Sequence, residues 1–425
     1  MTSPVGPLDG YLVLDFTHIL AGPYCTQLLA DAGATVIKVE PPGGEYSRLR
    51  EPDRTDGHGN GVNAFSAAVN RHKRDICLDL KNPAGFRIAE QLIALADVLI
   101  ENFAPGAFDR AGLSLKRLRE ARPELVTCSI SLFGGLESAG EHARRGGLAI
   151  IAEAESGVGG LQRRADGSPM GLGFPLGDMG SGMAAYGAIV TALLVRERTG
   201  VGQHIDISMV KALLSLNSLA VMREELNPRS QADLVAFRTA AYGNFPAADG
   251  FVAIGVSNDR LFHRLLAVIG QDWMITDQRF AHRPISKPHV DEVNGLITEW
   301  TSARAASEVI AALSPLGIPC GLVATARDIL DSQMFAELGF LEEVGDGLGG
   351  LLHVPANPLG HTQSDPVIPL LNEHCAEVMA DLLGIEGEGY EQLRKEGAFG
   401  PALSRSLETP SPQGTRSGYR TFDKG

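Results

Sequence analysis

The sequence has a deficit of positive charge and few cysteines, and each shortage excludes a class of protein. Its 425 residues include 37 Lys and Arg against 51 Asp and Glu, which gives a net charge of −14. This acidic balance argues against nucleic acid or an anionic membrane surface as the main partner, although a local basic patch can still hold a phosphate group. The five cysteines are widely scattered and form no C-x-x-C pair. They indicate reduced thiols and no metal site.

Long hydrophobic runs are also lacking. The longest, Met183 to Val195, is shorter than the roughly 20 residues that cross a bilayer. The opening MTSPVGPLDG does not have the basic segment and apolar core of a secretory signal. With 44% hydrophobic residues available for a core, the sequence predicts a globular cytoplasmic protein of enzyme size. At roughly 100–200 residues per domain, two or three domains are expected.

Glycine is the residue in excess, with 50 in the chain where about 7% is typical. Five of the glycines gather in the segment 171–182, GLGFPLGDMGSG, directly before a helical pattern. Their spacing fits neither the dinucleotide-binding pattern G-x-G-x-x-G nor the nucleophile pattern G-x-S-x-G. What remains is a single carboxylate, Asp178, with glycines on both sides.

The first 210 residues alternate short β-rich runs with helical patterns, which predicts an α/β fold. The expected architecture is a Rossmann-like, doubly wound parallel sheet with helices on both faces. We assign 1–228 to the first part of this large domain, 229–324 to a smaller α+β domain, and 325–399 to a return to the large domain. Residues 400–425 are rich in Ser, Pro, Thr and Arg and are expected to form a disordered or extended tail. The expected strands are Leu12–Phe16, Thr35–Glu40, Val98–Glu101, Val126–Ser131 and His204–Ser208.

Asp178 lies at the N-terminus of the predicted helix at 180–198, two residues before its first residue, and this position suggests chemistry. The partial positive charge of a helix N-terminus favours an ionised aspartate and can stabilise a nearby oxyanion. Gly177 and Gly180 lack side chains, so a substrate carbonyl can approach the backbone. An ionised carboxylate is a nucleophile for covalent group transfer. The alternative is that Asp178 only caps the helix.

Two further segments are candidates for binding a ligand. The basic run at residues 71–74, followed by Lys81, is suited to a phosphate-bearing molecule, or else forms a solvated loop. The segment from Glu101 to Arg110 follows the carboxyl end of an expected strand. Ligands bind at that edge of open α/β sheets, although an ordinary turn with a capped helix would have the same pattern.

Together these segments resemble the family III CoA-transferases, also called the CaiB/BaiF family, which include formyl-CoA transferase and the carnitine CoA-transferases. The resemblance covers about residues 8–385. It implies a transferase that moves CoA from a short acyl-CoA, such as succinyl-CoA, to a small carboxylic or dicarboxylic acid, with no prosthetic group or metal. It also implies a homodimer of two interlocked subunits. The matching motifs begin at LDGYLVLDFTHILAGP and continue through NRHKRDICLDLKNPAG, ADVLIENFAPGAFDRAGLS, LGDMGSGMAAYGAIVTALLVRERTGVGQHIDISM and IPCG.

The resemblance also implies roles for individual residues. Asp178 matches the aspartate that attacks the acyl-CoA thioester and becomes an aspartyl-CoA thioester, and Gly177 and Gly180 belong to the active-site loop. Lys81 and Arg110 are the expected phosphate partners. The family's contacts to CoA carry over to Leu78, Lys81, Asn102, Phe103 and Arg110.

Departures from the family pattern concern the acid that is bound. Leu20 stands where formyl-CoA transferase has a glutamine, and Pro41 where it has an arginine, so oxalate and formate are not expected substrates. Arg144 and Arg145 are candidates to bind a second carboxylate of a dicarboxylic acid, and a surface pair is the alternative.

Two other functions remain open from the sequence. The α-methylacyl-CoA racemases of the same family use a histidine where this chain has Leu148. Without that base, proton transfer at both faces of the substrate carbon is impaired, although His142 lies nearby in the sequence. A CoA-binding protein without turnover is the second alternative.

Overall fold

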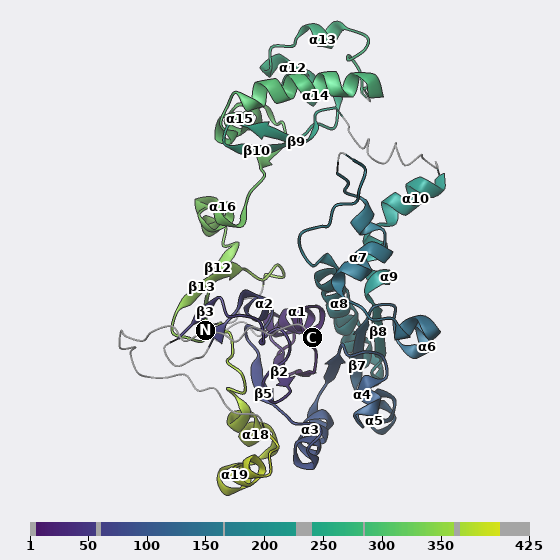
Figure 1. The fold of residues 1–425 in the computed structure, drawn as a ribbon, viewed down its shortest axis with the longest axis vertical. Coiled ribbons are helices and arrows are strands. Elements are labelled where there is room, and N and C mark those ends of the chain that lie inside the picture. Colours follow the sequence, from purple (N-terminus) through teal and green to yellow (C-terminus); the bar gives the residue numbers. More distant parts are fainter. Residues whose placement is uncertain are drawn as a thin grey trace, which may run out of the picture. The chain divides into compact units, whose positions relative to one another are not determined.

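A computed structural model describes residues 6–56, 61–164, 166–226, 240–283, 285–360 and 366–399 (Figure 1). These residues form two compact units. The first contains the chain up to Gln162, Pro169–Val221 and the part from Gly339 on, and the second contains Arg163–Ser168 and Met222–Leu338. The second unit begins before and ends after the small domain expected at 229–324. The tail expected at 400–425 lies outside the described residues.

A six-stranded sheet, parallel throughout, forms the centre of the first unit, as the sequence predicts for an α/β protein. The chain runs outward from β1 in one direction, then returns to β6 and runs outward in the other. The direction therefore reverses between β1 and β6, which is where open α/β sheets bind ligands. In spatial order the strands are β5 (Arg74–Cys77), β2 (Thr35–Glu40), β1 (Leu12–Asp15), β6 (Val98–Glu101), β7 (Val126–Ser131) and β8 (His204–Ser208).

Alternating side chains on the strands divide the core of this unit into two layers. Val13 of β1 packs with α1 (Ala21–Asp31) and α8 (Leu176–Thr199), while its neighbour Leu14 packs on the opposite face. Successive strand residues point to opposite faces, so each buried strand supplies both layers. The opposite face is covered by α3 (Pro83–Leu95) and α18 (Cys375–Leu383), so residues from both halves of the sequence build this unit.

Helix α8 is, among the described residues, the one helix long and apolar enough to cross a membrane by length and composition. Its residues Ala185, Ile189 and Leu193 are buried in the layer between α8 and the sheet. That packing explains the apolar side chains on the buried face of the helix, and Met183 and Leu194 remain exposed.

The basic run at 71–74 is part of the fold. Its three cations, Arg71, Lys73 and Arg74, each pair with an acidic side chain. The Lys73 ammonium is fully buried, and this burial lowers its pKa to about 8 despite the nearby Asp15. The run is therefore neither a phosphate site nor a solvated loop, since Arg71 and Lys73 neutralise buried acids and Arg74 pairs with the exposed Asp381. The pairs are Arg71–Asp31 (2.7 Å), Lys73–Asp15 (3.1 Å) and Arg74–Asp381 (2.7 Å).

The second unit has its own core between an antiparallel sheet and helices. Phe262, Val293 and Val309 are fully buried there. The strands are β9 (Tyr242–Ala247), β10 (Gly250–Gly255) and β11 (Cys320–Leu322), and the helices include α12 (Asp259–Val268), α14 (Lys287–Ser302), α15 (Ala306–Leu313), α16 (Ala326–Leu330) and α17 (Gln333–Glu337).

Shorter elements of the first unit complete the fold around the sheet. Three helices carry residues of the candidate site: α4 (Ala107–Arg110), α7 (Ala149–Glu155) and α9 (Met209–Leu216). Other short elements of this unit are α2 (Ala64–Ala67), α5 (Leu115–Ala121) and the hairpin of β12 (Leu341–Gly345) and β13 (Leu351–Pro355).

Candidate active site

Asp178 lies in the first turn of α8, half-buried. The residue before the helix, Pro175, has no side chain that can cap it. Glu153 of α7 takes this role instead, because its carboxylate accepts the Gly177 N–H at 3.0 Å. The two helices approach so closely that a Cβ atom added at Gly177 would lie 2.7 Å from both Cα and the carbonyl oxygen of Ala149. Glycine at 177 is therefore a steric requirement of this packing.

Burial and the neighbouring Glu153 raise the pKa of Asp178 to about 6. The helix N-terminus by itself favours a lower pKa, and burial and Glu153 outweigh that effect. Desolvation disfavours the charged form, and a like charge adds to it. At pH 7 about nine-tenths of such a carboxyl group is still ionised. Asp178 is thus a carboxylate of unusual basicity that remains available for attack at neutral pH.

The active-site glycines do not act as the sequence suggests. The Gly177 N–H donates to Glu153, so this amide does not offer a hydrogen bond to an oxyanion. Gly180 faces α9, where an added Cβ would lie 3.6 Å from a Leu216 methyl group. Close packing therefore requires glycine at 177, whereas an added Cβ at 180 would make only an ordinary van der Waals contact.

The start of α1 packs against α8 one helical turn beyond Asp178. A Cβ atom added at Gly182 would lie 2.5 Å from the Ala21 carbonyl oxygen and 3.1 Å from the Tyr24 ring. Leu20, directly before α1, is only 3% exposed. Leu20 therefore lies directly before the end of α1 that packs against α8 at Gly182.

Asn102 holds the loop between β1 and α1. Its side-chain amide accepts the His18 N–H at 2.7 Å and donates to the His18 carbonyl at 2.8 Å. Ile19, the residue after His18, has a φ of 68°, a backbone conformation that is strained for a β-branched side chain. Its N–H donates to the Glu45 carboxylate at 3.1 Å. In this structure Asn102 positions the loop that leads to Leu20, and its side chain does not line the cavity described next.

A cavity of about 180 Å³ lies at the carboxyl ends of β1, β2 and β5, beside the point where the strand order reverses. Its walls include three of the predicted CoA residues, Leu78, Lys81 and Phe103. The Phe103 ring meets the His18 ring edge to face, with 4.8 Å between centroids. Arg110 does not line the cavity and lies exposed at the end of α4.

Arg144 and Arg145 differ in their surroundings. The Arg145 guanidinium pairs with Glu155 at 2.6 Å and lies 4.8 Å above the Phe133 ring. Arg144 is exposed, with no ion pair to any residue in the described ranges. Of the two, only Arg145 therefore has an acidic partner among the described residues.

The residues that a racemase needs are not assembled here. Leu148 precedes α7 and is 60% exposed, so an aliphatic side chain occupies the position of the histidine base. His142 packs against Phe133, with 6.2 Å between ring centroids.

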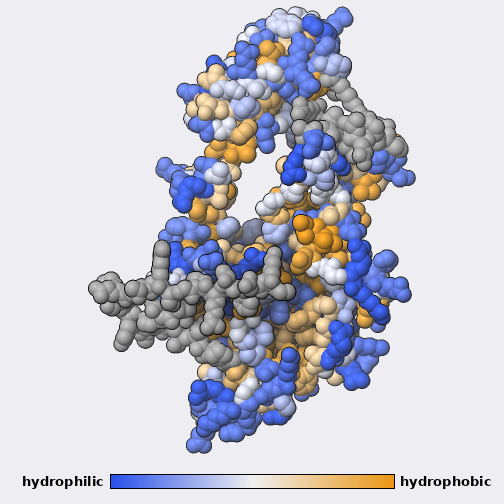
Figure 2. Space-filling model, viewed as in Figure 1, coloured by the Kyte–Doolittle hydropathy of each residue, from blue (hydrophilic) through white to orange (hydrophobic). Residues whose placement is uncertain are grey.

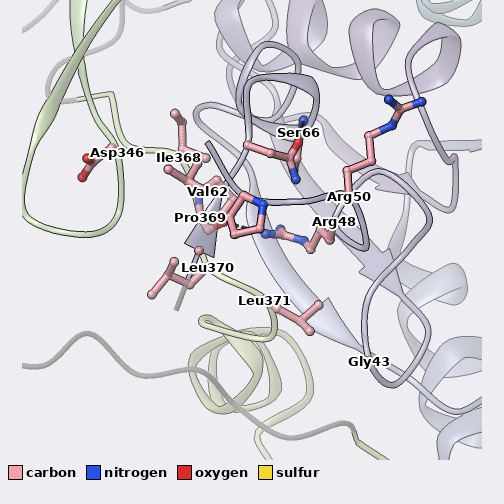
Figure 3. Close-up of a pocket in the computed structure, with 13 residues that line it drawn as sticks. Gly43, Arg48, Arg50, Val62, Ser66, Asp346, Ile368, Pro369, Leu370 and Leu371 are labelled. Atoms are coloured by element: carbon pink, nitrogen blue, oxygen red, sulfur yellow. Dashed lines mark hydrogen bonds between the residues drawn. The ribbon is translucent and has the colours of Figure 1, made fainter. Parts of the chain in front are cut away.

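A second cavity, of about 250 Å³, contains none of the residues predicted from the sequence (Figure 3). Arg48 in its wall is held by Glu40 at 2.6 Å and Asp75 at 2.8 Å, and Arg50 extends away from the other labelled side chains. The cavity lies between the loop after β2 and the segment Ile368–Leu371. Arg48, the cation in its wall, is therefore already paired with two carboxylates of the fold.

Comparison with known proteins identifies the class. The family model of CoA-transferase family III matches residues 8–375, and the chain belongs to this family. The resemblance seen in the sequence is thereby confirmed, and the protein is a CoA-transferase by class.

Relatives in the family carry different substrates in their names. Succinyl-CoA–D-citramalate CoA-transferase of Chloroflexus aurantiacus is 32% identical over 92% of this chain and 98% of its own length. Succinate–glutarate CoA-transferase of Agrobacterium fabrum is 32% identical over 89% of this chain and 96% of its own length. Formyl-CoA:oxalate CoA-transferase of Afipia carboxidovorans is 30% identical over 92% of this chain and 97% of its own length.

Solved structures have the same fold. A CAIB/BAIF family protein from Brucella suis is 31% identical and superposes with a TM-score of 0.78 over 89% of this chain and all of that one. Rv3272 from Mycobacterium tuberculosis is 30% identical and superposes with a TM-score of 0.74 over 88% and 99%.

Proposed function

We propose that the protein moves CoA from a short acyl-CoA, such as succinyl-CoA, to a small mono- or dicarboxylic acid, with Asp178 as the nucleophile. The observation that carries this proposal is the setting of Asp178. Its carboxylate lies in the first turn of α8 and makes no hydrogen bond to any described residue, and its pKa is raised to about 6. A more basic carboxylate is a stronger nucleophile, and an unpaired one does not have to break a bond before attack.

The proposed reaction is two exchanges on Asp178. A carboxylate oxygen attacks the thioester carbonyl, the carbon–sulfur bond breaks, and CoA leaves as a thiolate with a mixed anhydride on Asp178. The thiolate then attacks the aspartyl carbonyl and expels the first acid, which leaves an aspartyl-CoA thioester. The acceptor carboxylate repeats these steps in reverse. Each step exchanges similar groups, so positioning and stabilisation of the oxyanion provide most of the rate enhancement.

We propose that CoA binds along the cavity at the ends of β1, β2 and β5. Leu78 and Phe103 supply apolar walls for the pantetheine arm. Lys81 at the rim and Arg110 on α4 are exposed cations that suit its phosphates.

Replacing Lys81 or Arg110 by alanine is expected to weaken CoA binding without affecting the chemical step. A charge-assisted contact is worth about 1.5–3 kcal/mol, so the KM for the acyl-CoA rises by roughly tenfold or more, and kcat changes little. Steady-state kinetics measures both values. Lys116→Ala, an exposed lysine on α5, serves as the matched control. An unchanged KM in both variants would place the CoA phosphates elsewhere.

The acceptor acid is best found by a direct screen. The relatives named above act, by their names, on citramalate, glutarate and oxalate, and we propose Arg144 as the partner of a second carboxylate. The purified protein is incubated with acetyl-CoA or succinyl-CoA and a series of small acids, and new CoA thioesters are detected by mass. We expect transfer from succinyl-CoA to at least one of these acids. Absence of any new thioester would contradict the proposed function.

We also propose that the protein works in the cytoplasm as a homodimer, with the subunits interlocked as the family resemblance implies. Large apolar side chains are exposed on neighbouring helices of the first unit, where hydrophobic surface is visible in Figure 2. Exposed apolar surface of this kind is typical of an interface between protein chains. The residues are Leu148, Ile150, Met183, Leu194, Leu214 and Leu216.

A further inference from the structure

Glu153 is a buried acid beside the proposed nucleophile, and nothing in the sequence motifs points to it. Its side chain belongs to α7, and the residue is only 8% exposed. The partner of its carboxylate is a backbone group, the Gly177 N–H at 3.0 Å. Burying a carboxylate is costly unless it is paired with a cation or well hydrogen-bonded. This buried acid has no cationic partner among the described residues, and it is bonded to Gly177, the residue before Asp178. Such an acid calls for a functional explanation.

The geometry assigns two effects to this side chain. By accepting the Gly177 N–H, Glu153 caps α8 from a different helix, since Pro175 offers no side-chain cap. That bond ties the first turn, which carries Asp178, to α7. The carboxylate also occupies the positive end of the α8 dipole, which otherwise favours an ionised Asp178. Two carboxylates therefore share one helix N-terminus.

We propose that Glu153 is a positioning residue for the Asp178 carboxylate. Glu153 fixes the first turn of α8 and places a negative charge beside the nucleophile. This inference rests on the proposed role of Asp178 as nucleophile. Glu153 does not itself touch the reacting atoms in this proposal. Its charge makes the Asp178 carboxylate more basic, which favours attack on the thioester carbonyl.

Among the residues that the structure describes, the other helices packed around this turn bring no charged side chain that shifts the pKa of Asp178. From α1 the neighbours are Ala21 and Tyr24 at Gly182, and from α9 they are Leu213 and Leu216 at Gly180. Besides burial, the cause of the raised pKa of Asp178 is Glu153. Replacing Glu153 therefore removes the like charge and leaves the larger effect of burial, and the pH dependence of the first transfer step measures the change.

The test compares Glu153→Gln and Glu153→Ala with the wild type. Glutamine keeps an acceptor for the Gly177 N–H and removes the charge, whereas alanine removes both. The rate of acyl transfer to the protein is measured from pH 4.5 to 8.5 in single turnovers with succinyl-CoA. Glu120→Gln, an exposed acid on α5, is the matched control for the loss of one negative charge.

In the wild type and in Glu120→Gln, the rate is expected to fall below pH 7 with a midpoint near pH 6, because protonated Asp178 cannot attack. In Glu153→Gln the midpoint moves to lower pH, so the ratio of the rate at pH 5 to that at pH 8 rises several-fold. In Glu153→Ala the midpoint moves likewise and the rate also falls at every pH, since the first turn is no longer held.

A midpoint in Glu153→Gln equal to that of the wild type overturns the inference. If that variant does not fold, judged by its circular dichroism, Glu153→Asp replaces it. This variant keeps the charge but shortens the reach to Gly177, so we expect a slower reaction with the wild-type midpoint, and a lowered midpoint overturns the inference. Failure of the proposed function is recognised separately, because then the wild type forms no covalent adduct at any pH.

Discussion

Asp178→Ala is expected to abolish CoA transfer and the covalent CoA adduct together. The variant lacks the carboxylate that attacks the thioester, so neither the anhydride nor the aspartyl-CoA thioester can form. Removal of a covalent nucleophile commonly costs more than about 10³-fold in turnover. The experiment measures turnover with the acid found in the screen. It also measures the intact mass of the protein after incubation with acyl-CoA and acid quenching, where the wild type gains the mass of CoA at Asp178.

Two further variants make this result specific. Asp178→Asn keeps the size of the side chain and removes its charge, and it is expected to behave like the alanine variant. Asp9→Asn changes an exposed aspartate of the same unit and should retain both turnover and adduct. Full transfer activity in Asp178→Ala would show that another residue is the nucleophile.

Gly182→Ala is expected to destabilise the protein strongly and to lower its activity. The added methyl group would lie 2.5 Å from the Ala21 carbonyl oxygen, and a backbone atom cannot move aside as a flexible side chain can. Overpacking of this kind costs about 1–3 kcal/mol. Since α1 must shift away from α8, Leu20 and Asp178 separate as well. Thermal unfolding measures the loss as a lower Tm, and steady-state kinetics measures the loss of turnover.

Gly187→Ala is the matched comparison on the same helix. An added Cβ at Gly187 meets nothing within 4 Å, so the substitution only improves the helix. Alanine is favoured over glycine inside a helix by roughly 0.5–1 kcal/mol, and Tm is therefore expected to rise. Equal shifts of Tm in the two variants would contradict the close packing of α1 on α8.

The regular parts of the fold could be predicted from the sequence. All five expected strands are present with nearly the predicted limits, because Leu12–Asp15 and Val126–Ser131 are short apolar runs bounded by turns. The strand β5 was not predicted. Its sequence, RDIC, has charged residues that are typical of a loop, and the ion pairs of Arg74 with Asp381 and of Asp75 with Arg48 show why they are tolerated in the sheet.

The candidate site could be predicted only in part. Asp178 stood out because it is a lone carboxylate among glycines at a helix start. Glu153 did not, since an isolated glutamate on a short helix is usually solvated, and no local pattern says that this one is buried. Asn102 is predicted as a CoA contact, which stays a prediction, and its hydrogen bonds to the His18 backbone depend on the pairing of β1 with β6.

The sequence by itself determined the α/β class, the family and the position of the proposed nucleophile. These depend on periodicity and motifs, which are short-range properties of the chain. Only the tertiary structure decided the charge environment of that nucleophile. Glu153 reaches Gly177 across 24 positions of sequence, and the resulting burial and repulsion reverse the pKa shift that the helix dipole alone predicts. Electrostatic energies depend on distance and solvent exposure, and helix packing sets both.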